Sequence, residues 1–350
     1  MGEAVASNRT IHVCLCALLL ASSVAVAARK PSDQNEPSVK FKLYHDYLVV
    51  LQGSLGSLDK RNILVDTGTN PTVIDEEVAK KLDLKTIANS EHALHVLQKD
   101  VSSHYVQLPS LDFGPLHREN LAVIVTDLSV FRRVEGVRID AIVGLDALGR
   151  RSFRINYGDK RIVFGPVAAN PRAVHFTSEP PFVTIPITIR DQQLQVLVDT
   201  GTASLVVFSN RAGEWQNNVP VVGQRRSSNV AGQVSMREVD LGETLIGSVA
   251  LGPRSAFITE NHCCKFDGLM GISGKNMKEI AFDFEHNLFS WRLRDADDWP
   301  LLEGQQQTAC NSDSKSPKWV SNARSAGLAL TDSEVDVNCA SAPRKPSRAN

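Results

Sequence analysis

The sequence predicts an all-β protein with few short helices, built from two related units, and three observations support this. Runs rich in apolar, β-branched and aromatic residues recur along the chain, separated by turn residues. The pentapeptide Val-Asp-Thr-Gly-Thr ends one such run at residues 65–69 and another at residues 198–202. Apolar segments that lead to Gly144 and Gly271 follow the two copies at similar intervals. A repeat in this order indicates an internal duplication.

The first unit is expected over residues 39–168. After Asp75, charged residues alternate with Val78, Leu82 and Leu84, which predicts a short helix with Asp75 as its N-cap. The other apolar runs of this unit predict strands at residues 41–51, 61–65, 71–75, 92–97, 104–108, 121–126 and 140–145, and a closing hairpin over 153–164.

The second unit is expected over residues 172–295 and repeats this order. Its runs predict strands at residues 182–189, 193–198, 205–208, 230–239, 243–251, 255–259 and 267–272, and a closing hairpin over 280–292.

Length and composition agree with two domains. A chain of 350 residues is longer than a single hydrophobic core usually serves. The net charge of -1 argues against nucleic acid or an anionic membrane as a partner, because neither sign dominates. Residues 28–38 are predicted to be a polar linker. Residues 296–350 have too little apolar sequence to bury and are predicted to be a disordered tail.

The N-terminus predicts export. Residues 11–27 form an apolar run that ends in Ala-Val-Ala, which is typical of a secretory signal peptide over residues 1–27. The alternative is an uncleaved anchor, although a membrane span needs about 20 apolar residues. We expect an exported protein, periplasmic or secreted, with no stable membrane span after cleavage.

The cysteines agree with an oxidising compartment. Four remain after signal cleavage and are expected to form disulfides or to be free thiols: Cys263, Cys264, Cys310 and Cys339. The alternative is a metal site at residues 262–264 with His286. Adjacent cysteines are not the usual spacing of zinc ligands, so we expect no metal.

The repeated pentapeptide supplies two carboxylates, Asp66 and Asp199. Each follows a strand and precedes a glycine, on a tight loop that can approach a related loop closely. Two carboxyls within about 3 Å cannot both ionise, so the pair would share one proton. One member could then act as a general base on water while the other donates a proton to a carbonyl oxygen. This chemistry calls for no cofactor.

A strand, Asp-Thr-Gly-Thr, a second strand and a distant apolar-apolar-glycine segment together resemble the aspartic proteases. The short units resemble two retropepsin-like halves joined in one chain, over roughly residues 40–295. The resemblance implies two β-barrel-like lobes with pseudo-twofold symmetry, a polypeptide substrate and a monomer. It implies that Asp66 and Asp199 are catalytic.

The resemblance also implies supporting roles for the neighbouring residues. Thr67 and Thr200 would hydrogen-bond across the two lobes, and the glycines Gly68, Gly201, Gly144 and Gly271 would allow close packing at the site. Thr69 and Thr202 would donate hydroxyl groups to the carboxylates, which lowers a carboxyl pKa and suggests an acidic optimum. The family covers its cleft with a hairpin, for which residues 92–108, with Tyr105, and 230–234 are candidates.

Two other interpretations compete with a protease. Each aspartate could simply stabilise a turn, which explains one copy of the motif but not two. The more serious alternative is a non-catalytic relative, a bilobal module or inhibitor that holds a peptide or glycan in its cleft. Intact Asp-Thr-Gly in both units argues against it.

Overall fold

The computed structural model describes residues 36–96, 99–179, 182–260 and 265–294. These residues are mostly β-strand with three short α-helices, which confirms the all-β prediction. No helix in these ranges is long and apolar enough to cross a membrane. Several predictions concern segments outside them: the signal peptide at 1–27, most of the linker at 28–38, the tail at 296–350, and Cys263, Cys264, Cys310 and Cys339.

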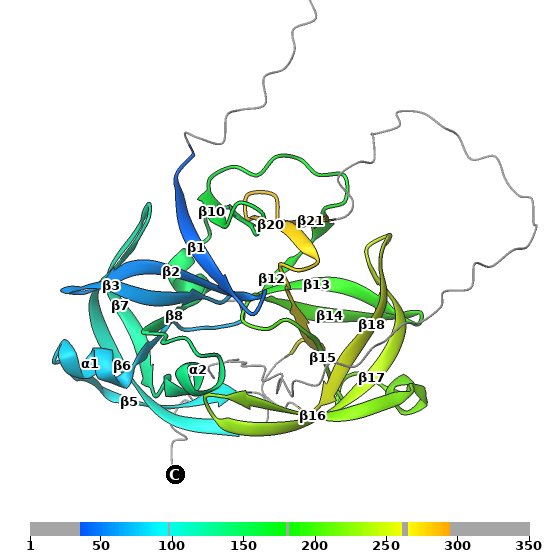
Figure 1. Cartoon of the computed structure of the whole chain (residues 1–350), viewed down its shortest axis with the longest axis horizontal. Coiled ribbons are helices and arrows are strands. Elements are labelled where there is room, and N and C mark those ends of the chain that lie inside the picture. Colours follow the sequence, from blue (N-terminus) through cyan, green and yellow to red (C-terminus); the bar gives the residue numbers. More distant parts are fainter. Residues whose placement is uncertain (1–35, 97–98, 180–181, 261–264, 295–350) are drawn as a thin grey trace, which may run out of the picture. The chain divides into compact units, whose positions relative to one another are not determined.

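The elements up to residue 164 are coloured blue to green in Figure 1. They are β1 (Ser38–Tyr44), β2 (Leu48–Leu55), β3 (Leu58–Val65), β4 (Val73–Asp75), α1 (Glu76–Lys81), β5 (Thr86–Val96), β6 (Lys99–Phe113), β7 (Leu116–Thr126), α2 (Ser129–Val134), β8 (Ala141–Val143), α3 (Leu145–Leu148), β9 (Phe153–Asn156) and β10 (Arg161–Phe164).

The elements that follow include one short 3-10 helix, η1. They are β11 (Val174–His175), β12 (Thr177–Glu179), β13 (Phe182–Ile189), β14 (Gln192–Asp199), β15 (Leu205–Phe208), η1 (Glu214–Asn218), β16 (Val221–Asn229), β17 (Gly232–Ile246), β18 (Val249–Thr259), β19 (Gly268–Gly271), β20 (Met277–Asp283) and β21 (Leu288–Leu293).

Twelve of these strands form two closed rings of six. The first ring has the order β2-β3-β8-β4-β7-β6, and β6 pairs back to β2. The second has the order β13-β14-β19-β15-β18-β17, and β17 pairs back to β13. Directions match as well, because β3–β8, β4–β7, β14–β19 and β15–β18 are the parallel pairs. The two pentapeptides thus lie at the ends of equivalent strands, β3 in the first ring and β14 in the second.

A shared sheet joins the hairpins that the sequence placed in separate units. Its order is β11-β21-β20-β9-β10-β1, and Ile155 of β9 pairs with Ile280 of β20. The rings of Phe153 and Phe282 stack there with centroids 4.8 Å apart. β1 leads from this sheet into β2. This pairing does not test the predicted boundary between the two units at residues 168–172, which stays a prediction.

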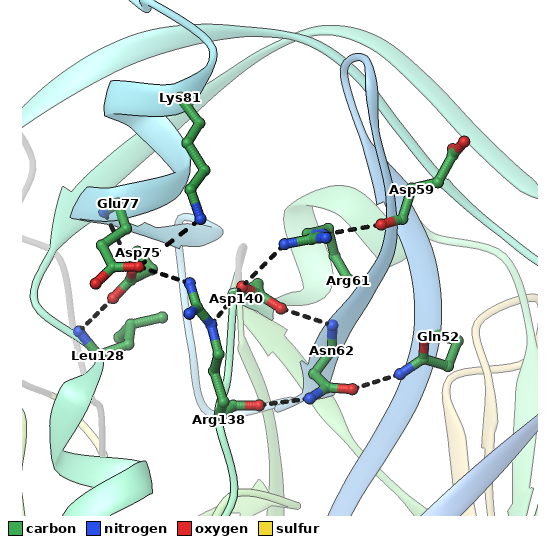
Figure 2. Close-up of polar contacts among 10 residues, drawn as sticks. All are labelled: Gln52, Asp59, Arg61, Asn62, Asp75, Glu77, Lys81, Leu128, Arg138 and Asp140. Atoms are coloured by element: carbon green, nitrogen blue, oxygen red, sulfur yellow. Dashed lines mark hydrogen bonds and ion pairs between the residues drawn. The ribbon is translucent and has the colours of Figure 1, made fainter.

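A buried carboxylate, that of Asp140, bonds to the backbone of β3 at Asn62, ahead of the first pentapeptide (Figure 2). The Asn62 N–H donates to Oδ2 of Asp140 (2.9 Å), and the Asp140 N–H donates back to the Asn62 carbonyl (2.8 Å). The Arg138 guanidinium donates to Oδ1 (3.0 Å). In the second ring, Asp267 makes the same exchange with Gln195, at 2.9 and 2.7 Å. Both aspartates lie at the strand ends remote from the pentapeptides.

Local predictions were correct where a single side chain decides the structure and wrong where a turn interrupts an apolar run. Asp75 caps α1, accepting from the Glu77 N–H at 3.1 Å. The single strand predicted at 41–51 is wrong, because His45 and Asp46 adopt positive φ and make a turn between β1 and β2. The strand predicted at 230–239 is wrong at its start, because residues 230–231 form the turn between β16 and β17.

Replacing Asp140 with alanine should destabilise the protein by about 1–3 kcal/mol, because the half-buried Asn62 N–H loses its acceptor. Urea unfolding of the variant measures this change. The matched control is Asp59→Ala, whose carboxylate is exposed and accepts from Ser54, and it should change stability by less than about 0.5 kcal/mol. Equal effects of the two substitutions would contradict the assigned role of Asp140.

Candidate functional site

Two loops, defined here as the first loop (residues 66–72) and the second loop (199–204), meet through their threonines. The Thr67 N–H donates to the Thr200 hydroxyl oxygen (3.1 Å), and the Thr200 N–H donates to that of Thr67 (3.2 Å). The Thr67 hydroxyl donates to the Val198 carbonyl (2.6 Å), and the Thr200 hydroxyl donates to that of Val65 (3.0 Å). Both threonines are fully buried. The four bonds hold the loops together without charge.

The loops place Asp66 and Asp199 side by side and buried, with exposed fractions of 1% and 0%. Their carboxyl groups are hydrogen-bonded to each other. The Gly68 N–H donates to Oδ1 of Asp66 and the Gly201 N–H donates to Oδ1 of Asp199, each at 2.7 Å. The Thr69 hydroxyl donates to Oδ2 of Asp66 at 2.7 Å. The two aspartates that the sequence singled out therefore form one site.

Each glycine makes room for the carboxyl group of the opposite loop. A Cβ on Gly68 would lie 2.6 Å from the carboxyl carbon of Asp199, and one on Gly201 would lie 2.5 Å from Oδ2 of Asp66. Atoms cannot approach that closely without displacing the carboxyl groups. The glycines are therefore required by contact across the site.

The pKa of Asp66 lies well above its usual value. Burial is the largest cause, and the charge of Asp199 and their mutual hydrogen bond add to it. The bonds from Thr69 and the Gly68 N–H act in the opposite direction and are outweighed. The Thr69 hydroxyl therefore lowers the pKa of Asp66 as expected, but the expected net lowering is wrong for this residue. A raised pKa keeps one proton on the pair over a wider pH range.

The glycines of the apolar segments lie directly behind the loops. A Cβ on Gly144 would lie 2.0 Å from the Thr69 carbonyl oxygen, and one on Gly271 would lie 2.3 Å from the Ser204 nitrogen. Gly271 is also the strand partner of Asp199. In the second loop the Thr202 hydroxyl oxygen accepts from the Ser204 N–H at 3.4 Å.

Sequence reasoning missed Asp146, which anchors the end of the first loop. Its carboxylate accepts from the Thr72 N–H and from the Thr72 hydroxyl, both at 2.8 Å. The same hydroxyl oxygen accepts from the Gly144 N–H at 3.3 Å. Burial raises the pKa of Asp146, and the bonds from Thr72 oppose this shift. The sequence signal for this contact was the aspartate two residues after Gly144. Its partner, Thr72, could not be predicted because it is distant in the sequence.

The two hairpins proposed as covers lie in different surroundings. Tyr105 of β6 is half-buried, and burial first and the charge of Asp146 second raise its pKa. Residues Val230 and Ala231, in the turn of the β16–β17 hairpin, pack against an apolar cluster of the first ring that includes Leu48 and Phe131. This second hairpin therefore reaches from one ring to the other.

Within the described ranges, no group of three or more His, Cys, Asp or Glu side chains could hold a metal ion. The alternative metal site at residues 262–264 lies outside those ranges. Its proposed fourth member, His286, has its Nδ1 atom 2.8 Å from Oδ2 of Asp283.

Comparison with known families agrees with the geometry of the first loop. Residues 51–147 match the family model for aspartyl proteases, a range that includes Asp66, Gly144 and Asp146. The second loop lies outside the matched range. A search of curated proteins found no match. The match supports a place for the chain in the aspartic protease superfamily.

Stability should depend on pH through Asp66. A carboxyl whose pKa is raised on folding stabilises the protein below its unfolded pKa of about 3.9, and this contribution is lost as the pH rises through the folded pKa. Asp66→Asn cannot ionise, so its stability should fall less between about pH 4 and pH 7 than that of the wild type. Thermal unfolding across this range measures the difference.

The matched control is Asp199→Asn, which leaves Asp66 ionisable but removes the neighbouring charge. It should show an intermediate pH dependence. Parallel stability curves for the wild type and Asp66→Asn would contradict the raised pKa.

Replacing Thr72 with valine tests the anchor of the first loop. The variant keeps the size of the side chain but removes the hydroxyl that bonds Asp146 and Gly144. We expect a loss of about 1–3 kcal/mol in urea unfolding, because the half-buried Asp146 loses one donor. Thr72→Ser keeps the hydroxyl and should retain most of the stability. If both substitutions destabilise equally, the hydroxyl is not the anchor.

Proposed function

We propose that the chain is an aspartic endopeptidase that hydrolyses peptide bonds with a water molecule activated between Asp66 and Asp199. The observation that carries the proposal is the contact of two buried carboxyl groups, held together by reciprocal threonine bonds. The family match over residues 51–147 adds support for the first half of the site.

In the proposed mechanism the pair begins with one proton. The ionised carboxylate takes a proton from water as the water oxygen attacks the carbonyl carbon of the substrate, and the protonated carboxyl donates its proton to the carbonyl oxygen. The tetrahedral intermediate then collapses, and a proton passes to the leaving nitrogen. Burial serves this chemistry, because it keeps one proton on the pair.

The proposal includes the organisation of the whole chain. Equal strand order and direction in the two rings support an origin by internal duplication, with one catalytic aspartate from each half. We further propose that residues 1–27 direct export to the periplasm or the outside of the cell, and that the protein acts as a monomer on polypeptides. The single chain supplies both aspartates, so catalysis requires no second copy.

The alternative is a non-catalytic module that binds a peptide or glycan. Burying two carboxyl groups side by side costs stability. A module that only binds its ligand gains nothing from such a pair. The intact pair therefore favours the enzyme.

Cleavage of a peptide library by the purified protein, from about pH 3 to about pH 8, tests the proposal. Asp66→Asn and Asp199→Asn should each lower the cleavage rate at least about 100-fold, because each removes a group that transfers protons. Mass spectrometry of the products measures the rate and the cleaved bonds.

Asp59→Ala serves as the control and should cleave as the wild type does, because Asp59 is exposed and remote from the pair. A wild type that is inactive at every pH, or asparagine variants that match it, would rule out the protease. Saturable peptide binding without cleavage would instead favour the binding module.

A further inference from the structure

The sheet that contains the second ring ends in an open strand, β16, with exposed apolar side chains. β16 is the last strand in the sheet order, and among the described residues it pairs with β17 alone. Val221 and Val222 at its start are 55% and 58% exposed, the highest values for large apolar side chains in the described part of the chain. Open strand edges readily pair with a further strand. This edge is therefore a place where another segment can bind.

The register of the β16–β17 hairpin shows which backbone groups of β16 face outward (Figure 1). A two-residue turn, residues 230–231, joins Asn229 to its partner Gly232. The residues that flank such a turn exchange hydrogen bonds, and along an antiparallel pair every second residue does the same. The N–H and carbonyl groups of Gln224 and Arg226 therefore point away from β17. Both residues are exposed, so this part of the edge is accessible.

Arg226 gives the open edge a positive charge. No ion pair of its side chain occurs among the described residues. By contrast, the neighbouring Arg225 donates to Glu238 at 3.0 Å. In chain order the edge thus presents two exposed valines and then, four residues after Val222, an arginine without a carboxylate. A strand that complements this edge in parallel would carry an apolar side chain and, four residues later, an acidic one.

A segment of the C-terminal tail has this order. Residues 328–334 place two leucines and two acids at alternate positions, which lie on one face of an extended chain. They are Leu328, Leu330, Asp332 and Glu334. When this segment is aligned parallel to β16 with Leu330 beside Val222, Glu334 comes beside Arg226, because the two intervals are equal. Antiparallel alignment from the same leucine would place the acids away from Arg226.

The tail is long enough to reach this edge. About 30 residues lie between Arg294, the last described residue, and the segment, and in extended form they span roughly 100 Å. A compact domain of this size has a radius of gyration of only about 18 Å. The tail holds a second acidic and apolar run at residues 295–303, but there the acids precede the leucines. Pro300, which separates them, has no N–H to donate to a strand.

We propose that residues 328–334 bind to β16 as an added parallel strand, with Leu330 beside Val222 and Glu334 beside Arg226. The added strand covers the exposed valines and supplies a carboxylate to the arginine. It also ties the tail to a hairpin whose turn packs on the first ring. This interaction does not depend on the proposed peptidase activity.

Hydrogen exchange measured by mass spectrometry tests the proposal on the full chain and on a chain that ends at residue 325. All proteins carry Asp66→Asn, so that a peptidase cannot cut the tail. Loss of the tail should speed exchange in the segment that contains Gln224 and Arg226 about tenfold, because their N–H groups lose acceptors. Exchange in β14 should not change. A synthetic peptide of residues 326–337 should restore the slow exchange and should bind the shortened chain saturably.

A charge exchange tests the register. Arg226→Glu in the shortened chain should weaken peptide binding about fivefold, and a peptide with Glu334→Arg should bind this variant as the original peptide binds the unaltered chain. Arg172→Glu is the matched control, because it reverses an exposed arginine outside β16 and should leave binding unchanged. Urea unfolding verifies that each variant is folded.

Equal exchange in the full and shortened chains would overturn the proposal. Exchange that slows as the protein concentration rises, with or without the tail, would instead show that a second copy of the chain covers β16. A peptide of the same composition in scrambled order that binds equally well, or a charge exchange that fails to restore binding, would overturn the assigned register.

Discussion

The mutual contact of two buried carboxyl groups is the constraint on which the rest of the structure depends. Bringing Asp66 and Asp199 together costs free energy, because both carboxyl groups lose hydration and their negative charges repel. The surrounding chain must therefore hold them in contact. The reciprocal bonds of Thr67 and Thr200 do so with neutral groups. Glycine at positions 68 and 201 is the steric condition, because any side chain there would occupy the position of the opposite carboxyl.

The strands of the two rings position the loops that carry Asp66 and Asp199 and pack against them. In each ring a parallel pair of strands carries an aspartate on one strand and a glycine on the other, and the register matches Asp199 with Gly271. At the far ends of the same strands, Asp140 and Asp267 satisfy backbone groups that would otherwise be left open. One strand pair is thus fastened at both ends, which restricts sliding of the loop that it carries.

The sequence was sufficient for what depends on short stretches of chain. The strands that end at residues 65 and 199, the capped helix after Asp75 and the paired aspartates all follow from local pattern. The turn at His45 could not be predicted, because positive φ at a residue other than glycine leaves no clear signal. The bond between Thr72 and Asp146, and the joining of β9 to β20, depend on contacts between distant segments that no local pattern contains.

The two halves of the site are alike in backbone but not in how each loop is held. The Asp146 carboxylate holds the first loop by accepting two hydrogen bonds from Thr72. At the corresponding place after Gly271 stands Ser273, whose hydroxyl oxygen accepts from the Lys275 N–H in its own turn. The second loop relies there on backbone bonds, including one from the Gly271 N–H to Ser204. The pair is therefore held from behind in two different ways, by a carboxylate behind the first loop and by backbone bonds behind the second.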